Sequence, residues 1–431
     1  MLTLTRSLEW FRRAREVIPG VSQTASKRPG NFAPGAYPVY ITHGKGGRVW
    51  DADGNSYVDF VSALGPVILG YADEEVNEAV RKQLARGVCF SVMHPLEVEL
   101  AERLRELVPC AEMSRFFKTG AEACNAAVRI ARAQTGKTVV LSSGYHGWLD
   151  WWAASTGEPG VPEALRRGIE TFRLNDEEGL LEGRRKHAGD IACIFLEPAS
   201  YQEPERSFLD LIATIAREEK ALVIFDEIVT GFRLALGGAQ QYYGFVPDLA
   251  TFAKGISNGL PLAALCGKRG VMERAGELLI SSTYGGETLS LAAASATLEK
   301  LERDDCIGLL HRLGGMLASG FREAFASAGV PCTVSGPAPM TNFSFHPHEK
   351  ALEPLMQHYF LQELARRGYL FRRGGLNLIQ ASHSEGDIHG AVAAIAEVAK
   401  DMSALVVEGS LAEHLIVSDE LAGGRRFSPR S

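Results

Sequence analysis

The sequence predicts an α/β protein, with a mostly parallel central sheet that helices cover on both faces and a smaller α+β domain. The first observation is length, because 431 residues exceed what one domain usually holds. The second is that short apolar runs alternate with helical segments between residues 116 and 266, which is typical of a buried parallel sheet. The third is a change to longer helical segments after about residue 305. We expect residues 56–304 to form the large domain, and residues 1–55 and 305–431 to form the smaller one.

The chain before the alternating region combines helix, irregular chain and a hairpin. Residues 1–20 carry apolar side chains at helical spacing between arginines, which predicts an amphipathic helix rather than a secretory signal. Residues 22–40 are rich in Pro, Gly and Ser and should be irregular. Residues 48–60 predict two short strands joined by an Asp-Gly turn. Leucines at helical spacing predict a helix over residues 96–108.

The following region supplies the strands of the sheet and the remaining helices. Apolar runs predict strands over residues 138–143, 191–196, 221–225 and 262–266. Helical spacing predicts helices over residues 122–134, 208–220, 309–328, 353–367 and 385–407. The tail after Ala422 is expected to fray.

Composition narrows the class of function. The net charge is −7 and the pI is about 5.9, which disfavours nucleic acid as the main partner because phosphate binding needs a basic surface. The seven cysteines are scattered and form no CxxC pair, so a disulfide framework or a zinc site is not expected, and a reducing cytosol fits. No apolar stretch approaches the length of a membrane span.

Two charged residues at the ends of apolar runs carry the strongest chemical signal. Lys254 ends the run 249–253 and is followed by a glycine-rich turn, so it is a candidate for a Schiff base. Asp226 ends the run 221–225, where a carboxylate can partner a pyridinium nitrogen. Taken alone, Asp226 could cap a helix and Lys254 could be surface charge.

Three further segments have the composition of a cofactor site. Residues 118–123 (KTGAEA) lie where a helix starts, and free N–H groups there bind phosphate, although a capped helix start is the ordinary alternative. Tyr145 lies between glycines after a predicted strand and could stack on a flat ring or simply pack in a turn. His146 beside it is expected to be structural. Residues 282–288 (STYGGET) could supply a phosphate hydroxyl or cap a helix.

With these segments in view, the chain resembles the class III aminotransferases, which have the type I fold of enzymes that use pyridoxal phosphate (PLP). Within that family it is most similar to the subgroup that contains glutamate-1-semialdehyde aminomutase. The resemblance runs from about residue 18 to residue 398. Its segments are 50–55 (WDADGN), 64–66 (LGP), 119–123 (TGAEA), 145–147 (YHG), 196–198 (LEP), 225–233 (FDEIVTGFR), 247–249 (PDL), 254–255 (KG) and His383.

The resemblance implies roles for the residues around the cofactor ring. Lys254 would form the internal aldimine with PLP and then carry the proton between the substrate α-carbon and the cofactor C4′. Asp226 would pair with the pyridinium nitrogen, and Glu197 would support that side of the ring. Tyr145 would stack on the ring, with Ile228 behind it.

The resemblance also implies a phosphate site and a partner subunit. Thr119, Gly120 and Ala121 would hold the phosphate. Thr283 would reach the phosphate of the neighbouring subunit's cofactor, so the enzyme would be an obligatory homodimer with shared active sites. Arg28 lies near the place of an arginine that binds the substrate carboxylate, to which its guanidinium is suited.

Several departures from the family pattern concern the substrate. The family usually has Ser or Thr where this chain has Ala121, which removes one phosphate hydroxyl. The aminomutase has tryptophan at the place of Leu64 and a pocket glutamate at the place of Gly375, so the sequence argues against its reaction.

The resemblance therefore implies a cytoplasmic PLP-dependent aminotransferase of biosynthesis. It would move an amino group from an amino donor to a ketone or aldehyde of a small metabolite, such as an amino sugar, a β-amino acid or a specialised metabolite. The alternatives are intramolecular amino transfer of the aminomutase type and a non-catalytic scaffold with this fold. From the sequence we expect neither a nucleic acid nor a membrane as a partner, and no bound metal.

Overall fold

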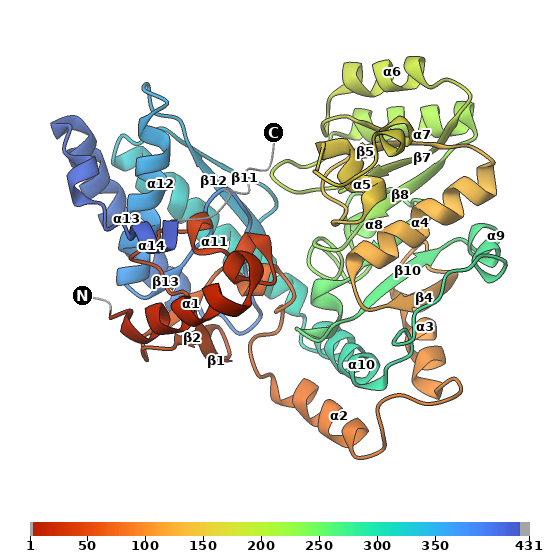
Figure 1. Ribbon diagram of the computed structural model, residues 1–431, viewed down its shortest axis with the longest axis horizontal. Helices are drawn as coiled ribbons and strands as arrows, with labels where there is room; N and C mark the ends of the chain where they lie inside the picture. Colours follow the sequence, from red (N-terminus) through yellow and green to blue (C-terminus); the bar gives the residue numbers. More distant parts are fainter. Residues whose placement is uncertain (1–2, 423–431) are drawn as a thin grey trace. The chain divides into compact units, whose positions relative to one another are not determined.

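The computed structural model describes residues 3–422, which form two compact units (Figure 1). The large unit comprises Gly65–Ile68 and Glu74–Ile307. Of the described residues, the small unit comprises residues 3–64, Leu69–Asp73 and residues 308–422. The tail after Ala422, for which fraying was expected, lies outside the described residues.

The large unit is built on a seven-stranded sheet. In spatial order its strands are β4 (Met113–Phe117), β10 (Ala263–Gly267), β9 (Leu249–Phe252), β8 (Leu222–Asp226), β7 (Ile191–Leu196), β5 (Val139–Ser143) and β6 (Ile169–Thr171). All neighbours from β9 to β6 pair in parallel, whereas β10 is antiparallel to both β9 and β4. The prediction of a mostly parallel sheet is thus confirmed.

The reversal of β10 has a simple cause in the chain length before it. Only residues 253–262 connect β9 to β10, and a parallel return needs a crossover of a dozen or more residues. The chain therefore turns back on itself through the short 3-10 helix η7 (Lys254–Ser257). This tight return is what places Lys254 directly at the end of β9.

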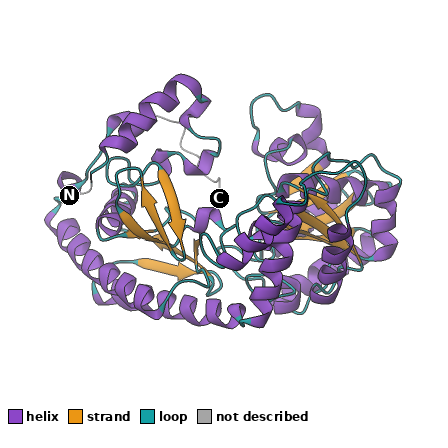
Figure 2. Ribbon diagram, turned by 90° about the horizontal axis from the view of Figure 1, so that it is seen from below, coloured by secondary structure: helices purple, strands orange, loops and turns teal. Residues whose placement is uncertain are grey.

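Helices cover both faces of this sheet, as Figure 2 shows for the strands of the large unit. Every residue of β5 and β7 is buried, and successive side chains of a strand point to opposite faces. The helix α4 (Gly120–Thr135) packs against β9 and β10 through small buried residues, mainly alanines. The helix α7 (Arg206–Glu219) packs against β7 and β8. The other helices of the unit are α2 (Glu74–Leu84), α3 (Pro95–Leu107), α5 (Asp150–Ala153), α6 (Glu177–Lys186), α8 (Ala239–Tyr242), α9 (Arg269–Met272) and α10 (Thr288–Arg303).

The small unit is α+β and has two small sheets. One sheet has the order β1 (Ile41–Lys45), β2 (Arg48–Asp51), β3 (Ser56–Asp59) and β13 (Tyr369–Leu370), and the other has the order β11 (Cys332–Ser335), β12 (Met340–Phe345) and β14 (Asn377–Leu378). The predicted hairpin is confirmed, because β2 and β3 pair antiparallel with Val49 opposite Tyr57. The helices are α1 (Thr5–Val17), α11 (Cys306–Ser327), α12 (Leu352–Arg366), α13 (Glu385–Glu408) and α14 (Asp419–Ala422).

Most predicted elements are found within one to three residues of their expected ends, and the irregular stretch 22–40 contains only short 3-10 turns. Among the elements that had no predicted counterpart are the strands β1, β6, β11 and β12 and the helices α2 and α6. Among the described residues, no helix is long and apolar enough to cross a membrane.

Candidate active site

The parallel strands of the large unit bring four predicted residues to one edge of the sheet. Asp226 is the last residue of β8, Tyr145 follows β5 by two positions, and Glu197 comes directly after β7. Lys254 follows β9 by two positions. The carboxyl ends of parallel strands share an edge, and ligands of open α/β sheets bind there.

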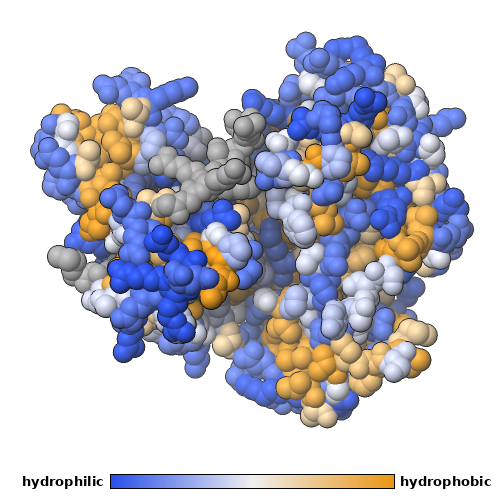
Figure 3. Space-filling view, viewed as in Figure 1, coloured by the Kyte–Doolittle hydropathy of each residue, from blue (hydrophilic) through white to orange (hydrophobic). Residues whose placement is uncertain are grey.

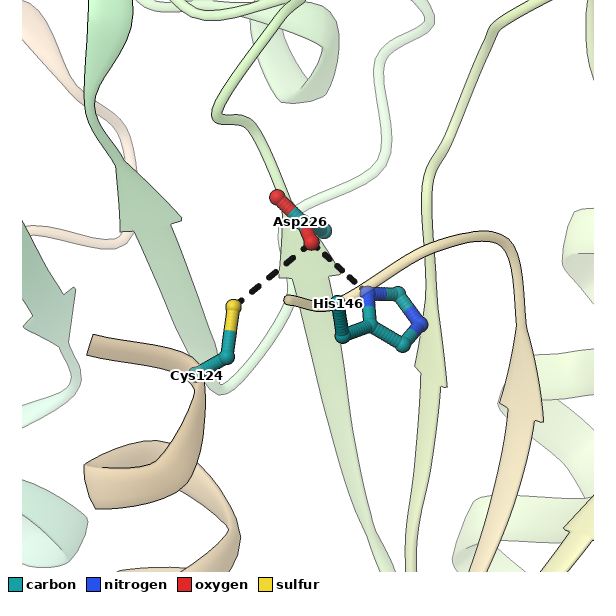
Figure 4. Close-up of side chains that lie close together, drawn as sticks. All are labelled: Cys124, His146 and Asp226. Atoms are coloured by element: carbon teal, nitrogen blue, oxygen red, sulfur yellow. Dashed lines mark hydrogen bonds and ion pairs between the residues drawn. The ribbon is translucent and has the colours of Figure 1, made fainter. Parts of the chain in front are cut away.

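Asp226 lies at the centre of a buried hydrogen-bond network (Figure 4). Its Oδ2 lies 2.7 Å from Nδ1 of His146 and accepts a hydrogen bond from the Cys124 thiol at 3.6 Å. Its Oδ1 accepts the backbone N–H of Ile228 at 3.1 Å. Asp226 is 2% exposed, and Cys124 and His146 are fully buried. The carboxylate is therefore held in one orientation by groups from three separate segments.

The same three side chains could also be considered as metal ligands, since their donor atoms lie within 4.8 Å of one another. The contact between His146 and Asp226 is 2.7 Å, whereas two ligands at about 2.0–2.1 Å from a tetrahedral zinc lie roughly 3.4 Å apart. Burial and the charge of Asp226 raise the pKa of the Cys124 thiol well above its usual value, and metals bind the thiolate. The three side chains are therefore arranged as hydrogen-bond donors around the Asp226 carboxylate rather than as ligands around a metal ion.

His146 is fixed by aromatic packing as well as by Asp226. Its ring stacks on Phe195 of β7 with 4.2 Å between centroids and 9° between planes. Its Nε2 is buried and has no hydrogen-bond partner in the described chain. The expectation that His146 is structural fits these contacts, and the structure adds that it orients Asp226.

The neighbouring carboxylate, Glu227, belongs to a different network. It is fully buried, and it accepts the backbone N–H groups of Ala239 and Gln240 and the hydroxyl of Thr230. These donors hold the start of α8 against the end of β8. Of the two adjacent acids, only Asp226 faces the cluster formed by Cys124 and His146.

Glu197 and Tyr145 are joined directly. The backbone N–H of Tyr145 donates to Glu197 Oε2 at 3.0 Å. Burial, followed by the charge of Asp226, raises the pKa of Glu197, while the charges of His146 and Lys254 act in the opposite sense. The Tyr145 ring is half exposed and meets the edge of Trp152 at 4.8 Å.

Glycines on either side of Tyr145 make room for this arrangement. Gly144 has φ +107°, and a Cβ there would lie 2.6 Å from the Glu197 carboxylate. Gly147 has φ +102°, and a Cβ there would lie 2.6 Å from the Cβ of Ala121. Both positions therefore require glycine for conformation and for space.

The start of α4 forms the second end of the site. Thr119 caps the helix in a capping box with Glu122, and its hydroxyl donates to that carboxylate at 3.0 Å. In the described chain, the N–H groups of Gly120 and Ala121 have no acceptor, and they carry the positive end of the helix dipole. A Cβ on Gly120 would lie 2.4 Å from Ile228 Cδ1, so the backbone there is closely covered on one side. This end offers backbone donors to an anion.

Lys254 is held in an unusual backbone conformation. Its φ is +46°, in the left-handed region that residues other than glycine rarely adopt, which costs of order 1–3 kcal/mol. The turn that follows is anchored in the large unit, where Asn258 accepts the N–H of Ile68 at 3.0 Å and Gly255 packs against the Ile68 side chain. The fold thus maintains a strained position at the residue with the strongest chemical signal.

The two remaining candidates lie elsewhere in their units. Thr283 is exposed on the loop before α10, and no hydrogen bond joins it to the Asp226 cluster among the described residues. Arg28 lies in the small unit between two 3-10 turns, with its guanidinium against Gly20. Of the predicted set, the large unit brings together Lys254, Asp226, Glu197, Tyr145, Ile228 and the start of α4.

The residue that sequence analysis did not single out is Cys124. It lies four positions after Gly120, so helical spacing places it on the same face of α4 as the first turn. Among seven scattered cysteines, this spacing was the only available signal.

Comparison with known proteins identifies the family. The model of the family described as aminotransferase class-III matches residues 32–384. The chain is 37% identical over 404 residues to a 3-aminobutyryl-CoA aminotransferase from Cloacimonas acidaminovorans (strain Evry), covering 92% of this chain and 97% of that one. It is also 37% identical to a glutamate-1-semialdehyde 2,1-aminomutase from Methanothermobacter thermautotrophicus, with coverage of 91% and 98%.

Among solved structures, the chain is similar to the FumI protein of Sphingopyxis sp. MTA144, determined in its PLP internal aldimine form. The TM-score is 0.87 with 25% identity, over 94% of this chain and 98% of that one.

The geometry fits PLP at both ends. The buried carboxylate of Asp226 is the partner that a protonated ring nitrogen needs, and the unpartnered N–H groups of Gly120 and Ala121 suit a phosphate. Both ends lie in one unit, on elements that pack against each other. The sequence match over most of the chain and the fold agree with this chemistry. The chain belongs to the class-III aminotransferase family and is a PLP-dependent enzyme of the type I fold.

Proposed function

We propose that this enzyme is an aminotransferase that moves an amino group from an amino donor to the ketone or aldehyde of a small biosynthetic metabolite. The observation that carries the proposal is the buried carboxylate of Asp226, fixed by three donors at the sheet edge that also carries Lys254. PLP supplies an electron sink that stabilises negative charge at a carbon next to the amino nitrogen. A fixed carboxylate at the ring nitrogen is the protein's contribution to that property.

The roles proposed for the individual residues are those that the family resemblance implies, and the positions of these residues support them. Lys254 holds the cofactor through Nζ and then moves the proton between the substrate α-carbon and the cofactor C4′. Asp226 keeps a proton on the ring nitrogen, and Glu197 supports this side of the ring. Tyr145 stacks on one face of the ring, and Ile228 lies behind the other.

At the other end of the cofactor, the backbone N–H groups of Gly120 and Ala121 bind the phosphate. Thr119 assists as the cap of α4 rather than through a free hydroxyl, because that hydroxyl is bonded to Glu122. The family's second hydroxyl is absent at Ala121, so backbone groups carry the greater share of phosphate binding.

The substrate is proposed to be a β-amino compound, in preference to an amino sugar or another specialised metabolite. This proposal is supported by the name of one relative, a 3-aminobutyryl-CoA aminotransferase. In a 3-aminobutyryl group the amino nitrogen is bound to the third carbon. Leu64 and Gly375 depart from the aminomutase pattern, which favours a pocket of different shape. Arg28 is the candidate for binding a substrate carboxylate.

An alternative is intramolecular amino transfer of the aminomutase type. The observation in its favour is that an aminomutase is as similar to this chain as the aminotransferase is, at 37% identity over nearly the whole length. The departures at Leu64 and Gly375 stand against it.

We further propose that the enzyme works as a homodimer in which Thr283 reaches the partner's phosphate. Apolar side chains are exposed between the end of α2 and the start of α3, and Figure 3 shows apolar surface in this part of the large unit. The residues are Leu84, Phe90, Val92, Met93 and Val98. A cavity of about 450 Å³ lies nearby, lined by α3, β4 and Ser281, Ser282, Gly285 and Gly286 of the Thr283 loop. Exposed apolar patches often lie at protein–protein interfaces, and this supports the proposed dimer.

The proposed compartment is the cytoplasm. All seven cysteines lie in the described chain and are free, which fits a reducing environment.

The decisive experiment is a panel of amino donors and carbonyl acceptors, with the cofactor's visible spectrum recorded for each. A donor should convert the cofactor to its pyridoxamine form, and an acceptor should restore the original spectrum with ping-pong kinetics. The aminomutase alternative predicts sustained turnover of a semialdehyde by the pyridoxamine form without any added donor. If no donor changes the spectrum of cofactor-loaded enzyme, the proposed function is refuted.

A further inference from the structure

The cofactor site contains a side chain whose role the family comparison leaves open. Cys124 lies in the second turn of α4, fully buried, and its sulfur lies 3.6 Å from Asp226 Oδ2 (Figure 4). The sulfur also lies 3.6 Å from Thr251 Oγ1. Thr251 belongs to β9, the strand that leads to Lys254. The Cys124 thiol therefore connects α4 to both β8 and β9.

The thiol acts as a hydrogen-bond donor. Burial and the charge of Asp226 raise its pKa well above the usual value, so it keeps its proton. A thiol has one proton, and a carboxylate is a stronger acceptor than a hydroxyl. The S–H thus points to Asp226, and the Thr251 hydroxyl can donate to the sulfur.

The two oxygens of Asp226 have different surroundings as a result. Oδ2 receives donors from His146 and Cys124, whereas Oδ1 receives the N–H of Ile228. Donors to a carboxylate favour its charged form and fix its rotation about the Cβ–Cγ bond. With Oδ2 occupied on two sides, Oδ1 is the oxygen that remains available to a ring nitrogen.

Cys124 also connects the two ends of the site. It lies on the helix whose first turn offers N–H groups to the phosphate, and it contacts the carboxylate that partners the ring nitrogen. The spacing between phosphate and ring nitrogen is set by the cofactor's covalent structure. A contact that fixes α4 against the end of β8 therefore sets the matching spacing in the protein.

We infer that Cys124 is a positioning residue for PLP, which orients Asp226 through its thiol proton and holds the phosphate-binding turn of α4 in register with it. The inference rests on the proposed function of Asp226 and the start of α4. It assigns to Cys124 no contact with the reacting atoms.

The test uses apo-protein loaded with PLP that carries ¹⁵N at the ring nitrogen. Two quantities are measured for each variant, the Kd for PLP and the ¹⁵N chemical shift, which reports protonation of the ring. Cys124→Ala removes the donor, Cys124→Val removes it while filling more of the space, and Cys124→Ser keeps a donor. Cys193→Ala is the matched control, because Cys193 is equally buried, on β7, and is not bonded to Asp226.

We expect Cys124→Ala and Cys124→Val to bind PLP about threefold to tenfold more weakly and to move the ¹⁵N shift toward the unprotonated ring. Cys124→Ser should stay within about twofold of the parent enzyme, since it keeps a donor. Cys193→Ala should match the parent in both quantities.

A second comparison separates orientation of Asp226 from simple packing. If Cys124 acts through Asp226, the effect of Cys124→Ala should nearly vanish in the Asp226→Asn background, because the two changes are then coupled. An undiminished effect in that background would overturn the inference, as would wild-type Kd and ¹⁵N shift in both donor-free variants. Failure of the parent enzyme to bind PLP would instead refute the proposed function itself.

Discussion

The two ends of the proposed cofactor site are built in different ways. Around Asp226, side chains from α4, from the turn after β5 and from β8 itself converge in a fully buried network. At the start of α4, by contrast, the donors are the backbone N–H groups of Gly120 and Ala121, and the Ile228 side chain covers Gly120 on one side. The end proposed for the ring nitrogen therefore depends on side-chain identity, whereas the end proposed for the phosphate depends on backbone shape. Substitutions should therefore have large effects at the first end and smaller ones at the second.

The largest effect on activity is expected at Lys254, which belongs to neither end. It is the residue proposed to bond to the cofactor and to move the proton. Lys254→Ala should keep the fold and bind PLP without a covalent bond, yet lose transamination by on the order of 10³-fold. The measurement is the single-turnover rate with a saturating amino donor, with circular dichroism as the control for folding. A variant that retains more than a tenth of the parent rate would contradict the assignment.

At the ring-nitrogen end, Asp226→Ala should slow removal of the substrate α-proton by roughly 10²–10³-fold, because the protonated ring loses its partner. The covalent bond to Lys254 should still form, so the visible spectrum should persist. A deuterated donor gives the check, since the isotope effect should rise as proton removal becomes limiting. The neighbouring acid provides the contrast, because Glu227→Gln should lower stability more than it lowers the α-proton rate. Unchanged turnover in Asp226→Ala would refute its role.

Much of this arrangement could be predicted from the sequence, and the exceptions have physical reasons. Apolar runs ending in Asp226 and Lys254 gave their positions, because strand ends are set by local patterns. The Cys124 contact could not be predicted, since it depends on how closely α4 packs on the sheet, and periodicity gives no packing distance. The reversed direction of β10 was not predicted either. The short connection 253–262 could have indicated it, because a parallel crossover needs a longer connection.

The elements without a predicted counterpart also lack a clear local pattern in the sequence. The strands β11 and β12 pair with each other across a Gly-Pro turn. The strand β11 has only four residues, and β12 carries the polar residues Thr341, Asn342 and Ser344, so neither is a long apolar run of the kind that predicts a buried strand. The candidate Arg28 is proposed from resemblance alone, because no local pattern indicates what a lone arginine in an irregular segment contacts.

At the phosphate end, a steric change should have a moderate effect. Gly120→Ala should weaken PLP binding about tenfold, because its Cβ would lie 2.4 Å from Ile228 Cδ1 and force the turn to shift. Adding Ile228→Val removes that methyl group and should recover part of the affinity. Equilibrium titration of the apo-protein measures both. Equal Kd values for the single variant and the parent would show that this turn does not hold the phosphate.

A substitution at the neighbouring residue should have a smaller effect on PLP binding at the same end. Ala121→Ser would restore the hydroxyl that the family usually has, and we expect PLP to bind about threefold to tenfold more tightly. The release rate of PLP after dilution is a suitable measurement, with Ala123→Ser on the same helix as the control for a change in helix stability. Slower release in the control alone would contradict the proposed place of the phosphate.

The smallest effect on the site is expected from His383, which lies in the small unit and acts on stability. Burial lowers its pKa from 6.5 to about 4, so the folded protein keeps it neutral where the unfolded chain would bind a proton. The resulting stabilisation is present above about pH 6.5 and is lost as the pH falls toward 4, by about 2 kcal/mol between pH 7 and pH 5. Urea unfolding at the two pH values, compared with His383→Gln, measures this contribution. An identical pH dependence in the variant would disprove it.

The central claim is that Lys254 holds the cofactor covalently while Asp226 faces its ring nitrogen. Borohydride reduction of the PLP-loaded enzyme, followed by peptide mapping, tests it most directly, because reduction makes the bond to Nζ permanent. We expect one modified peptide, with the cofactor mass on Lys254. A label on any other lysine, or none at all in enzyme that contains PLP, would contradict it.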